Sequence, residues 1–568
     1  MQTELTQPLR LSSKDAANAG LSYIYSRWPI LGQAIEHHRS TVQKPGGDEY
    51  EELTFHDKPW LAYIYKDESP TIIIQKCVQI GISEWALCSM FSFARRGKRG
   101  MYLLPDDEWR ATFVADRVDG LLDRVPFYKA NVGSLLQGGK QSDSKKFKNI
   151  FKTAWKFAGT HAKTAGSTAD IKKPKAAFEY QADCLLIDEY DEHEATDLAY
   201  MFDRLASAKD PIVRLFGNPT IEGRGIAAEF AKSDQKYWYV ECDKCGELQV
   251  LDWYKHFVKE EPEGSGVYSL RDSSVPGVGD INPVCTECGQ TFDRCGKGQW
   301  IPANHGAPIS GYAISRLFIG KRSHDILELW NKFREARNNP SAMQNFHNQW
   351  LGVPYENKED KLTEPVLIRC VGTHRTGVRD DMPRCTAGID QGKNYHVQIS
   401  EIIEGRRHKV YIGSVYDKES LRGILEKYNV SDLVLDAQGG GYAETRELVA
   451  SIDGAWMCFY RPKDQVKAVY DCDQKDHVVK TNRTEMCDLM VKSYKDGQVV
   501  LPVDWEAVDS GEFKKHMLVP HRLFDRSTGL PIWTKGVDHY FHADVYDYLA
   551  FLISGMWNSS GETGDWRV

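Results

Sequence analysis

Residues 72–83 read Ile-Ile-Ile-Gln-Lys-Cys-Val-Gln-Ile-Gly-Ile-Ser, and the helix-forming run Glu-Trp-Ala-Leu follows. An apolar run, a short loop and a helical pattern predict a strand–loop–helix unit. In a phosphate-binding loop of this form, backbone N–H groups hold phosphates, a lysine reaches the β- and γ-phosphates, and a Ser or Thr hydroxyl binds Mg²⁺. Gly81 and Ser83 match that pattern, whereas Lys76 replaces its first glycine and Ile82 its usual lysine. The alternative is a simple strand-to-helix turn with a solvated lysine.

A second motif lies about a hundred residues further on. The run Cys184-Leu-Leu-Ile-Asp-Glu189 is an apolar strand that ends in two carboxylates, Asp188 and Glu189. A carboxylate at the end of a parallel strand can hold Mg²⁺, and an adjacent glutamate can orient or deprotonate the attacking water. Alone, the run could be a buried strand followed by a solvated acidic turn. Together with the loop at 72–83, it predicts an ATPase.

The same region alternates strand-like and helix-like segments, which is typical of a parallel α/β sheet. We expect strands at 71–75, 100–104, 184–187 and 212–216. This pattern predicts a RecA/ASCE-like P-loop ATPase domain over 51–235, after an N-terminal arm at 1–50. After the last strand, Asn218 and Thr220 lie in a polar turn suited to sensing the γ-phosphate, although such a turn needs no function.

Residues 140–175 carry a concentrated positive charge. They contain ten lysines and two aspartates, a balance of +8, whereas the whole chain has 72 basic and 80 acidic residues and a net charge of −8. Phe147, Trp155 and Phe157 are interleaved with the lysines. We interpret the segment as a polyanion-binding track, with a solvated loop as the alternative.

Two Cys-x-x-Cys-Gly motifs follow, separated by 39 residues. Each motif turns two thiolates toward one point, and two such motifs complete a tetrahedral zinc site. We therefore predict a structural zinc ion in an insert at 236–305 that folds around the metal rather than a hydrophobic core; two reduced pairs without metal are the alternative. The predicted ligands are Cys242, Cys245, Cys285 and Cys288, and Cys295 is a spare thiol or an alternative ligand.

A bridge at 306–380 contains a helical pattern, His324–Asn339, and leads to a second α/β domain at 381–556 and a loose tail at 557–568. In that domain the strand patterns Cys385–Asp390 and Leu433–Asp436 each end in aspartate. A final helix brings Asp544 and Asp547 to one face by their i,i+3 spacing. This order predicts a ribonuclease-H-like nuclease that holds two divalent metals. Singly, each aspartate could be a turn or N-cap residue.

Composition excludes other classes of protein. The chain has 568 residues, of which 41% are hydrophobic and 27% are charged, and it contains no apolar run of about 18 residues that would span a bilayer. Its first 20 residues lack the pattern of a secretion signal. The 13 cysteines are an odd number and mostly scattered, which indicates reduced thiols. We expect a soluble protein that is not secreted and has no membrane partner.

With these motifs in this order, the chain resembles the large terminase subunit of tailed bacteriophages, of the lambda-like GpA type. The resemblance covers nearly the whole chain and depends on the order of its motifs. These are QKCVQIGIS, YLLPDDEWRATFVADRVDGLL, GSTADIKKPK, LLIDEYD, GNPT, the cysteine motifs, NQWLGVPYE, GID, LDAQGGGY and HADVYDYLAF.

The resemblance implies an ATP-driven motor that cuts concatemeric viral DNA and pumps double-stranded DNA through the portal of a procapsid. It implies a small terminase subunit as partner, a homo-oligomeric ring on the portal, and a place in the host cytoplasm. It also implies residue roles at two sites. At the ATPase site, Lys76, Gln79, Gly81 and Ser83 bind ATP and Mg²⁺, Asp188 binds that metal, Glu189 is the catalytic carboxylate, and Arg117 contacts phosphate. At the nuclease site, Asp390, Asp436 and Asp547 are catalytic and hold Mg²⁺ or Mn²⁺, with Asp544 as a fourth ligand. Gln79, where a basic residue is common, and Ile82 depart from the family pattern.

Two other functions remain open from the sequence. The Asp188–Asp191 run resembles a DExD box, which would suit a superfamily-2-like DNA remodeler or helicase; that class needs a second RecA-like domain, whereas the sequence predicts an aspartate-lined domain. A non-enzymatic protein that docks DNA or a capsid would need degenerate active sites, yet Asp390, Asp436 and Asp547 are intact.

Overall fold

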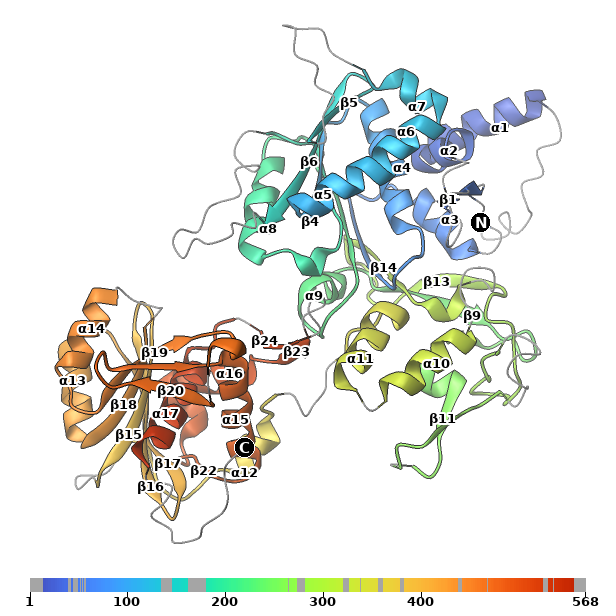
Figure 1. The fold of residues 1–568 in the computed structure, drawn as a ribbon. Coiled ribbons are helices and arrows are strands. Elements are labelled where there is room, and N and C mark those ends of the chain that lie inside the picture. The colour runs from blue at the N-terminus through green and yellow to red at the C-terminus, as the bar shows by residue number, and fades with distance from the viewer. Residues whose placement is uncertain are drawn as a thin grey trace, which may run out of the picture. The chain divides into compact units, whose positions relative to one another are not determined.

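The structure, a computed structural model, divides into two compact units, Met1–Glu356 and Asn357–Val568, which we treat separately (Figure 1). It describes residues 14–38, 42–43, 50–51, 53, 55, 58–133, 146–161, 180–263, 265–272, 281–319, 326–337, 339–355, 361–377, 383–437, 442–466, 468–524, 530–534 and 536–555. The tail at 557–568 and six lysines of the predicted polyanion track lie outside these residues: Lys140, Lys145, Lys163, Lys172, Lys173 and Lys175.

The first unit is built on a ten-stranded sheet. In spatial order its strands are β10 (Leu248–Val250), β9 (Lys236–Glu241), β14 (Ser310–Ile314), β3 (Thr71–Lys76), β8 (Ile212–Gly217), β7 (Cys184–Ile187), β4 (Gly100–Asp106), β6 (Thr153–His161) and β5 (Phe147–Ile150), and β13 (Gly298–Pro302) also pairs with β9. Strands β14, β3, β8, β7, β4 and β6 run parallel. The four predicted strands are confirmed, and β8 lies between the phosphate-loop strand β3 and the acidic strand β7, as in RecA/ASCE-like ATPases.

Helices cover both faces of this sheet. They are α1 (Lys14–Arg27), α2 (Pro29–Glu36), α3 (Pro59–Lys66), α4 (Ile82–Arg95), α5 (Asp107–Phe113), α6 (Gly120–Arg124), α7 (Pro126–Asn131), α8 (Ala195–Phe202), α9 (Gly225–Ala231), α10 (Ile326–Ala336) and α11 (Pro340–Asn345). Because side chains alternate along a strand, Ile72 and Ile74 pack in the cluster that contains α2 to α4, whereas Ile73 packs in the cluster that contains α8 and α9. A strand buried on both faces explains the continuous apolar run.

Three predicted segments differ from the structure in how they pack. Part of the predicted arm forms α2, whose Ile30 and Leu31 are buried in the main core. Residues 310–314 of the predicted bridge form β14, inside the sheet beside β3. The predicted zinc insert does not fold around the metal alone, because its Trp253 and Phe257 are buried in the main core. Trp253 stacks on Phe257 and contacts Phe333 of α10 edge-on. The sequence did not indicate these three contacts, because the periodicity of the segments is weak and their packing partners come from distant parts of the chain.

Two small hairpins complete the first unit. They are β1 (Val42–Gln43) with β2 (Tyr50–Glu51), and β11 (Val258–Glu260) with β12 (Tyr268–Leu270). Within the part of the chain that the structure describes, no helix has both the length and the apolar character needed to cross a bilayer.

The second unit has an eight-stranded sheet with the order β20 (Tyr470–Asp473), β21 (Val478–Thr481), β19 (Ala455–Tyr460), β18 (Val430–Asp436), β15 (Cys385–Gln391), β16 (Tyr395–Ile403), β17 (Arg406–Val415) and β22 (Val499–Val500). Strands β15, β16 and β17 pair antiparallel, whereas β18 and β19 continue the sheet in parallel on the other side of β15. This is the predicted ribonuclease-H-like arrangement. A separate hairpin joins β23 (Arg522–Phe524) to β24 (Pro531–Trp533).

Helices cover this second sheet on both faces (Figure 1). They are α12 (Glu364–Arg369), α13 (Lys418–Lys427), α14 (Tyr442–Ala450), α15 (Arg483–Lys495), α16 (Glu512–Leu518) and α17 (His539–Ser554). Leu433 and Leu435 pack in the cluster that contains α13 and α14, and Val434 packs in the cluster that contains α15 to α17.

Helix α17 lies directly on β15 at Gly388. A Cβ added to Gly388 would stand 2.0 Å from the backbone N of Asp547 and 2.1 Å from the carbonyl O of Ala543. Real Cβ atoms do not approach that closely. The glycine of the Gly-Ile-Asp motif therefore sets how near the final helix comes to the central strand.

We expect Gly388→Ala to push α17 away from β15 and to destabilise the second unit by at least about 1–3 kcal/mol, the usual cost of overpacking. Hydrogen exchange of peptides from α17, measured on the whole chain, should show lost protection. Gly423→Ala in α13 is the control, because an added Cβ there meets nothing within 4 Å. Equal protection in both variants would contradict this account.

Candidate active sites

The phosphate loop follows β3 and leads into α4. Lys76 is the last residue of β3, and α4 begins at Ile82 after Gly81, which has a φ of 89°. Gln79 is also left-handed, with a φ of 58°. Glycine adopts such a conformation without the steric cost of a Cβ. The turn therefore brings the backbone from the strand end directly to the N-terminus of α4, where free N–H groups can bind phosphate.

The two predicted ATPase motifs meet at this point. The Lys76 Nζ donates to Glu189 Oε1 at 2.9 Å, and the Ser83 hydroxyl donates to Asp188 Oδ2 at 3.3 Å. The Tyr102 hydroxyl donates to the same Asp188 oxygen at 2.9 Å. A cation, a hydroxyl and two carboxylates thus converge beside the helix start, which are the groups that phosphate and Mg²⁺ require.

The two carboxylates, Asp188 and Glu189, lie in different environments. Burial and the adjacent Glu189 raise the pKa of Asp188 to about 6, against the opposing effect of Lys76. Burial by itself would lower the pKa of Lys76, but Glu189 and Asp188 together raise it, so this lysine is charged. The Glu189 side chain is 20% exposed and can reach a solvent molecule, whereas Lys76 is 7% exposed.

The polar turn after β8 contacts the phosphate loop, the acidic segment after β7 and residue 355. The Asn218 Nδ2 donates to the carbonyl O of Lys76 at 2.8 Å, and the Thr220 hydroxyl donates to Asp191 Oδ2 at 2.7 Å. The backbone N of Tyr355 donates in turn to the carbonyl O of Thr220 at 3.0 Å. Asn218 and Thr220 therefore lie between the phosphate loop, the acidic strand and residue 355.

Arg117 lies in a π-helical turn, Val114–Asp119, next to the start of α4. Its guanidinium donates to Glu84 Oε1 at 3.2 Å, one residue beyond Ser83. The Arg117 side chain is 43% exposed. It therefore lies near the start of α4, the helix that follows the phosphate loop, and it remains accessible.

The four predicted cysteine ligands form one cluster. The Sγ atoms of Cys242 and Cys288 are 3.9 Å apart, and those of Cys245 and Cys285 are 3.7 Å apart. Four thiolates about 2.3 Å from a tetrahedral zinc stand about 3.8 Å from one another. The Gln249 Nε2 also donates to the Cys285 sulfur at 3.0 Å, which orients that thiol. The cluster of four does not include Cys295.

In the second unit, Asp390 and Asp436 lie at the carboxyl ends of neighbouring parallel strands, β15 and β18. Ile389 pairs with Leu435 in the register of β15 and β18, so the two aspartates stand side by side at the same edge. Each is 9% exposed. The His539 Nδ1 lies 2.7 Å from Asp390 Oδ2.

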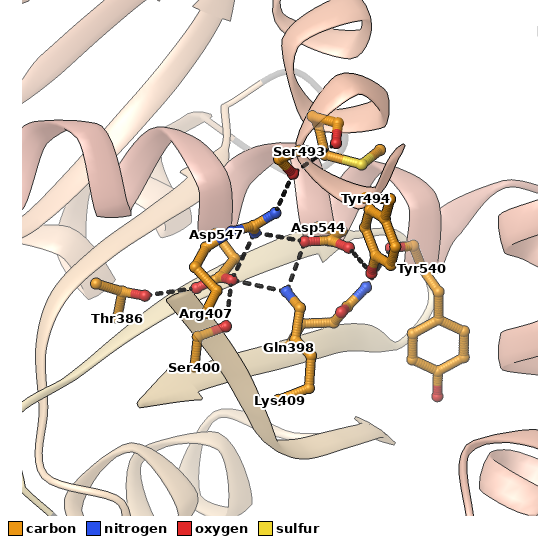
Figure 2. Close-up of polar contacts among 11 residues, drawn as sticks. Thr386, Gln398, Ser400, Arg407, Lys409, Ser493, Tyr494, Tyr540, Asp544 and Asp547 are labelled. Carbon is orange, nitrogen blue, oxygen red and sulfur yellow. Dashed lines mark hydrogen bonds and ion pairs between the residues drawn. The ribbon is translucent and has the colours of Figure 1, made fainter. Parts of the chain in front are cut away.

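Asp544 and Asp547 occupy a different environment, a buried cluster with Arg407 and Lys409 (Figure 2). The Lys409 Nζ lies 2.5 Å from Asp544 Oδ1 and 2.7 Å from Asp547 Oδ2, and one Arg407 nitrogen lies 2.7 Å and 3.0 Å from the same two oxygens. All four side chains are 0–1% exposed. Burial would raise the pKa of Asp544, but Lys409 and Arg407 lower it, so the carboxylate stays charged.

Neighbouring hydroxyls complete the cluster. Thr386 and Ser400 donate to the Asp547 oxygens at 2.7 Å and 2.6 Å, and the Tyr494 hydroxyl donates to Asp544 Oδ2. Two cations and two carboxylates make the cluster neutral, which is how buried charges are retained in proteins.

The structure does not bring Asp544 and Asp547 to Asp390. Asp547 contacts Thr386, which precedes Asp390 by four residues, about 13 Å along a strand. Asp547 follows His539 by eight residues, about 12 Å along a helix. Helix α17 therefore runs along β15 with His539 above Asp390 and Asp547 above Thr386.

Sequence analysis missed four residues of this domain: His396, His539, Arg407 and Lys409. His396 pairs with Asp390 across the β15–β16 hairpin, and the short turn between the two strands is a signal that could have indicated this pairing. Arg407 and Lys409 occur in an exposed-looking polar run, Arg406–Lys409. Nothing in that run alone shows that two of its cations are buried.

Comparison with known families decides between the functions left open. The family model described as "Phage terminase large subunit gpA, ATPase domain" matches residues 60–303, and "Terminase large subunit gpA, endonuclease domain" matches residues 309–540. The chain belongs to the phage terminase large-subunit gpA family. It accordingly has an ATPase domain and an endonuclease domain, as the resemblance implied, and it belongs with the large terminases that package phage DNA.

Solved structures similar to this chain include large terminases. That of bacteriophage HK97 is 12% identical, covers 92% of this chain and 99% of its own, and has a TM-score of 0.46. A large terminase from a thermophilic bacteriophage, in complex with ATP-gamma-S, is 10% identical, covers 85% and 94%, and has a TM-score of 0.28. The ATPase domain from Thermus phage P74-26 is 11% identical, covers 53% and 93%, and has a TM-score of 0.28. No curated protein sequence matches the chain.

We expect Lys409→Met to destabilise the second unit by about 3–5 kcal/mol, because Arg407 alone then faces two buried carboxylates and one negative charge stays uncompensated. Adding Asp547→Asn should restore part of the loss, since the buried charges then balance again. Chemical denaturation followed by near-UV circular dichroism gives the values, and Lys475→Met, at an exposed turn, is the control. A double variant less stable than Lys409→Met would contradict the balance argument.

Proposed function

We propose that this chain hydrolyses ATP at the Lys76–Glu189 site to translocate double-stranded DNA into a procapsid, and cuts concatemeric DNA at Asp390 and Asp436. The observation that supports the motor most directly is the convergence of Lys76, Ser83, Asp188 and Glu189 at the start of α4. These residues come from two segments of the chain more than a hundred positions apart, yet they lie together.

In the proposed ATPase, each group has a distinct role. Lys76 and the backbone around Gly81 hold the phosphates, and Gln79 borders them. Ser83 and Asp188 hold Mg²⁺, which supplies charge neutralisation at the phosphates when bound. Glu189 orients and deprotonates the attacking water, and its ion pair with Lys76 holds it in place. Arg117, accessible beside α4, contacts phosphate.

Loss of the γ-phosphate is relayed, in this proposal, through Asn218 and Thr220. Asn218 contacts the Lys76 backbone, and Thr220 connects Asp191 to Tyr355. Two further hydrogen bonds connect residues 349–355 to β3 and the phosphate loop. The Val78 N–H donates to the carbonyl O of Gln349 at 2.9 Å, and the Gln75 side chain donates to the carbonyl O of Gly352 at 3.1 Å. Residues 349–355 immediately precede the second unit in the chain, so a shift of the loop would reach them first.

For the nuclease, Asp390 and Asp436 are the proposed oxygen ligands of Mg²⁺ or Mn²⁺. We assign Asp544 and Asp547 to holding α17 in place rather than to metal binding, because two cations and three hydroxyls already satisfy their oxygens. Recruiting them to the metal would require breaking that cluster. Residues 383–437 and 442–555, where described, form a ribonuclease-H-like sheet rather than a second RecA-like domain, which argues against a helicase.

The remaining assignments depend on the family. We infer that the small terminase subunit and the portal protein are partners, that the chain forms a homo-oligomeric ring on the portal, and that it acts in the host cytoplasm. We also infer that the cysteine cluster holds one structural Zn²⁺, since its sulfur separations suit a tetrahedral site.

We expect Glu189→Gln to lower ATP turnover by about 10²–10⁴-fold, the usual contribution of a general base, with nucleotide still bound. Asp390→Ala should abolish plasmid cutting and leave ATP turnover unchanged. Phosphate release and nicking of supercoiled plasmid are measured for each, beside the exposed control Glu194→Gln. Loss of both activities in either variant would refute two independent sites.

For the zinc site, elemental analysis of purified protein should give about one zinc per chain. Cys245→Ser should lower that content, because a tetrahedral site loses one of its four thiolates. Cys295→Ser is the matched control and should keep its zinc. Zinc lost from Cys295→Ser and kept in Cys245→Ser would show that the ligand set is wrong.

A further inference from the structure

Three potential metal ligands meet at the end of β15. Asp390, His396 and His539 each offer one ligand atom, and these atoms all lie within 4.8 Å of one another. Asp390 and His396 are directly paired across the β15–β16 hairpin. His539 opens α17, and its imidazole reaches Asp390 from above the sheet.

The histidines are arranged in a way that hydrogen bonding alone does not explain. The rings of His396 and His539 stack with their centres 4.6 Å apart, and the ring of His516 lies 5.7 Å and 5.6 Å from them. The Nδ1 of His396 is buried, with no hydrogen-bond partner among the residues that the structure describes. An unsatisfied buried polar atom costs about 1–3 kcal/mol, so its presence calls for a ligand.

Each of the three residues is positioned by structure outside the trio. The hairpin register sets His396 opposite Asp390. The close approach over Gly388 and the buried cluster around Lys409 set the position of α17, and thus of His539. The His539 side chain is 41% exposed, so one side of the trio is open to water or substrate.

We propose that Asp390, His396 and His539 form a binding site for a divalent transition-metal ion such as Mn²⁺. Two imidazoles and one carboxylate, with open positions, are the ligand set that first-row transition ions take, whereas Mg²⁺ prefers oxygen ligands alone. Asp436, beside Asp390, adds negative charge that favours a cation there.

This inference rests on the proposed nuclease and specifies its metal. Asp390 is shared between the histidine pair and the oxygen ligand Asp436, so one of the two nuclease ions is bound partly through nitrogen. The site should therefore discriminate Mn²⁺ from Mg²⁺ in binding, whatever the rate of cutting with either ion.

The test is Mn²⁺ binding to the whole chain, followed by electron paramagnetic resonance. Wild type, His396→Asn, His539→Asn and the control His477→Asn, at an exposed turn, are titrated with MnCl₂. We expect each of the first two variants to bind Mn²⁺ at least about tenfold more weakly, and the control to match wild type. Bound Mn²⁺ in wild type should show electron spin-echo modulation from imidazole ¹⁴N. Near-UV circular dichroism of the metal-free proteins verifies that the variants are folded.

The outcomes separate this inference from the nuclease itself. The proposed Mn²⁺ site is wrong if both histidine variants keep the wild-type Mn²⁺ affinity, or if bound Mn²⁺ shows no ¹⁴N modulation. If wild type then still cuts plasmid with Mg²⁺, the nuclease proposal holds without this metal site. Weakened Mn²⁺ binding with ¹⁴N modulation in wild type supports the site even if no metal promotes cutting, and in that case the nuclease proposal fails. If a variant is misfolded, His→Gln at the same position replaces it in the same titration.

Discussion

Both sites depend on one constraint, which is that parallel strands bring their carboxyl ends to the same edge of a sheet. In the first unit, β3, β7 and β8 end in Lys76, the Asp188–Glu189 pair and the turn with Asn218. In the second, Asp390 and Asp436 lie at the carboxyl ends of β15 and β18. Residues far apart in the chain become neighbours because their strands share a direction, and loops at that edge are free to carry polar groups.

The same chemical pair, a lysine with carboxylates, has opposite consequences in the two units. At Lys76 the partner Glu189 is 20% exposed, so the pair can open to phosphate and water. At Lys409 the partners Asp544 and Asp547 are 0% exposed and also contact Arg407, which leaves no room for exchange. Burial and the number of partners, rather than residue type, distinguish the pair that we propose to be reactive from the structural one.

Much of the candidate ATPase site could be predicted from sequence because each of its parts is local. Gly81 and Ser83 lie where one loop meets α4, and Asp188 and Glu189 follow one strand. The cysteine cluster, a separate candidate site, could be predicted for the same reason, because its two motifs show their own spacing. The nuclease site is less local. Asp390 and Asp436 could be predicted from strand ends, but the helix aspartates have a spacing that suits metal binding and a buried ion cluster equally well. Their actual partners, Arg407 and Lys409, come from a strand whose register no short motif specifies.

By itself the sequence determined the two α/β units, their order, the strands that lead to the candidate site residues and the family to which the chain belongs, because periodicity and short motifs record local constraints. Only the tertiary structure decided which side chains surround each carboxylate. The approach of α17 over Gly388 places His539 beside Asp390 and buries Asp547 against Lys409. That outcome depends on helix-to-sheet packing and on the pairing of β15 with β16 and of β16 with β17. Such contacts join residues that are distant in the chain, as Thr386 and Asp547 are at a separation of 161 positions, and no local pattern records them.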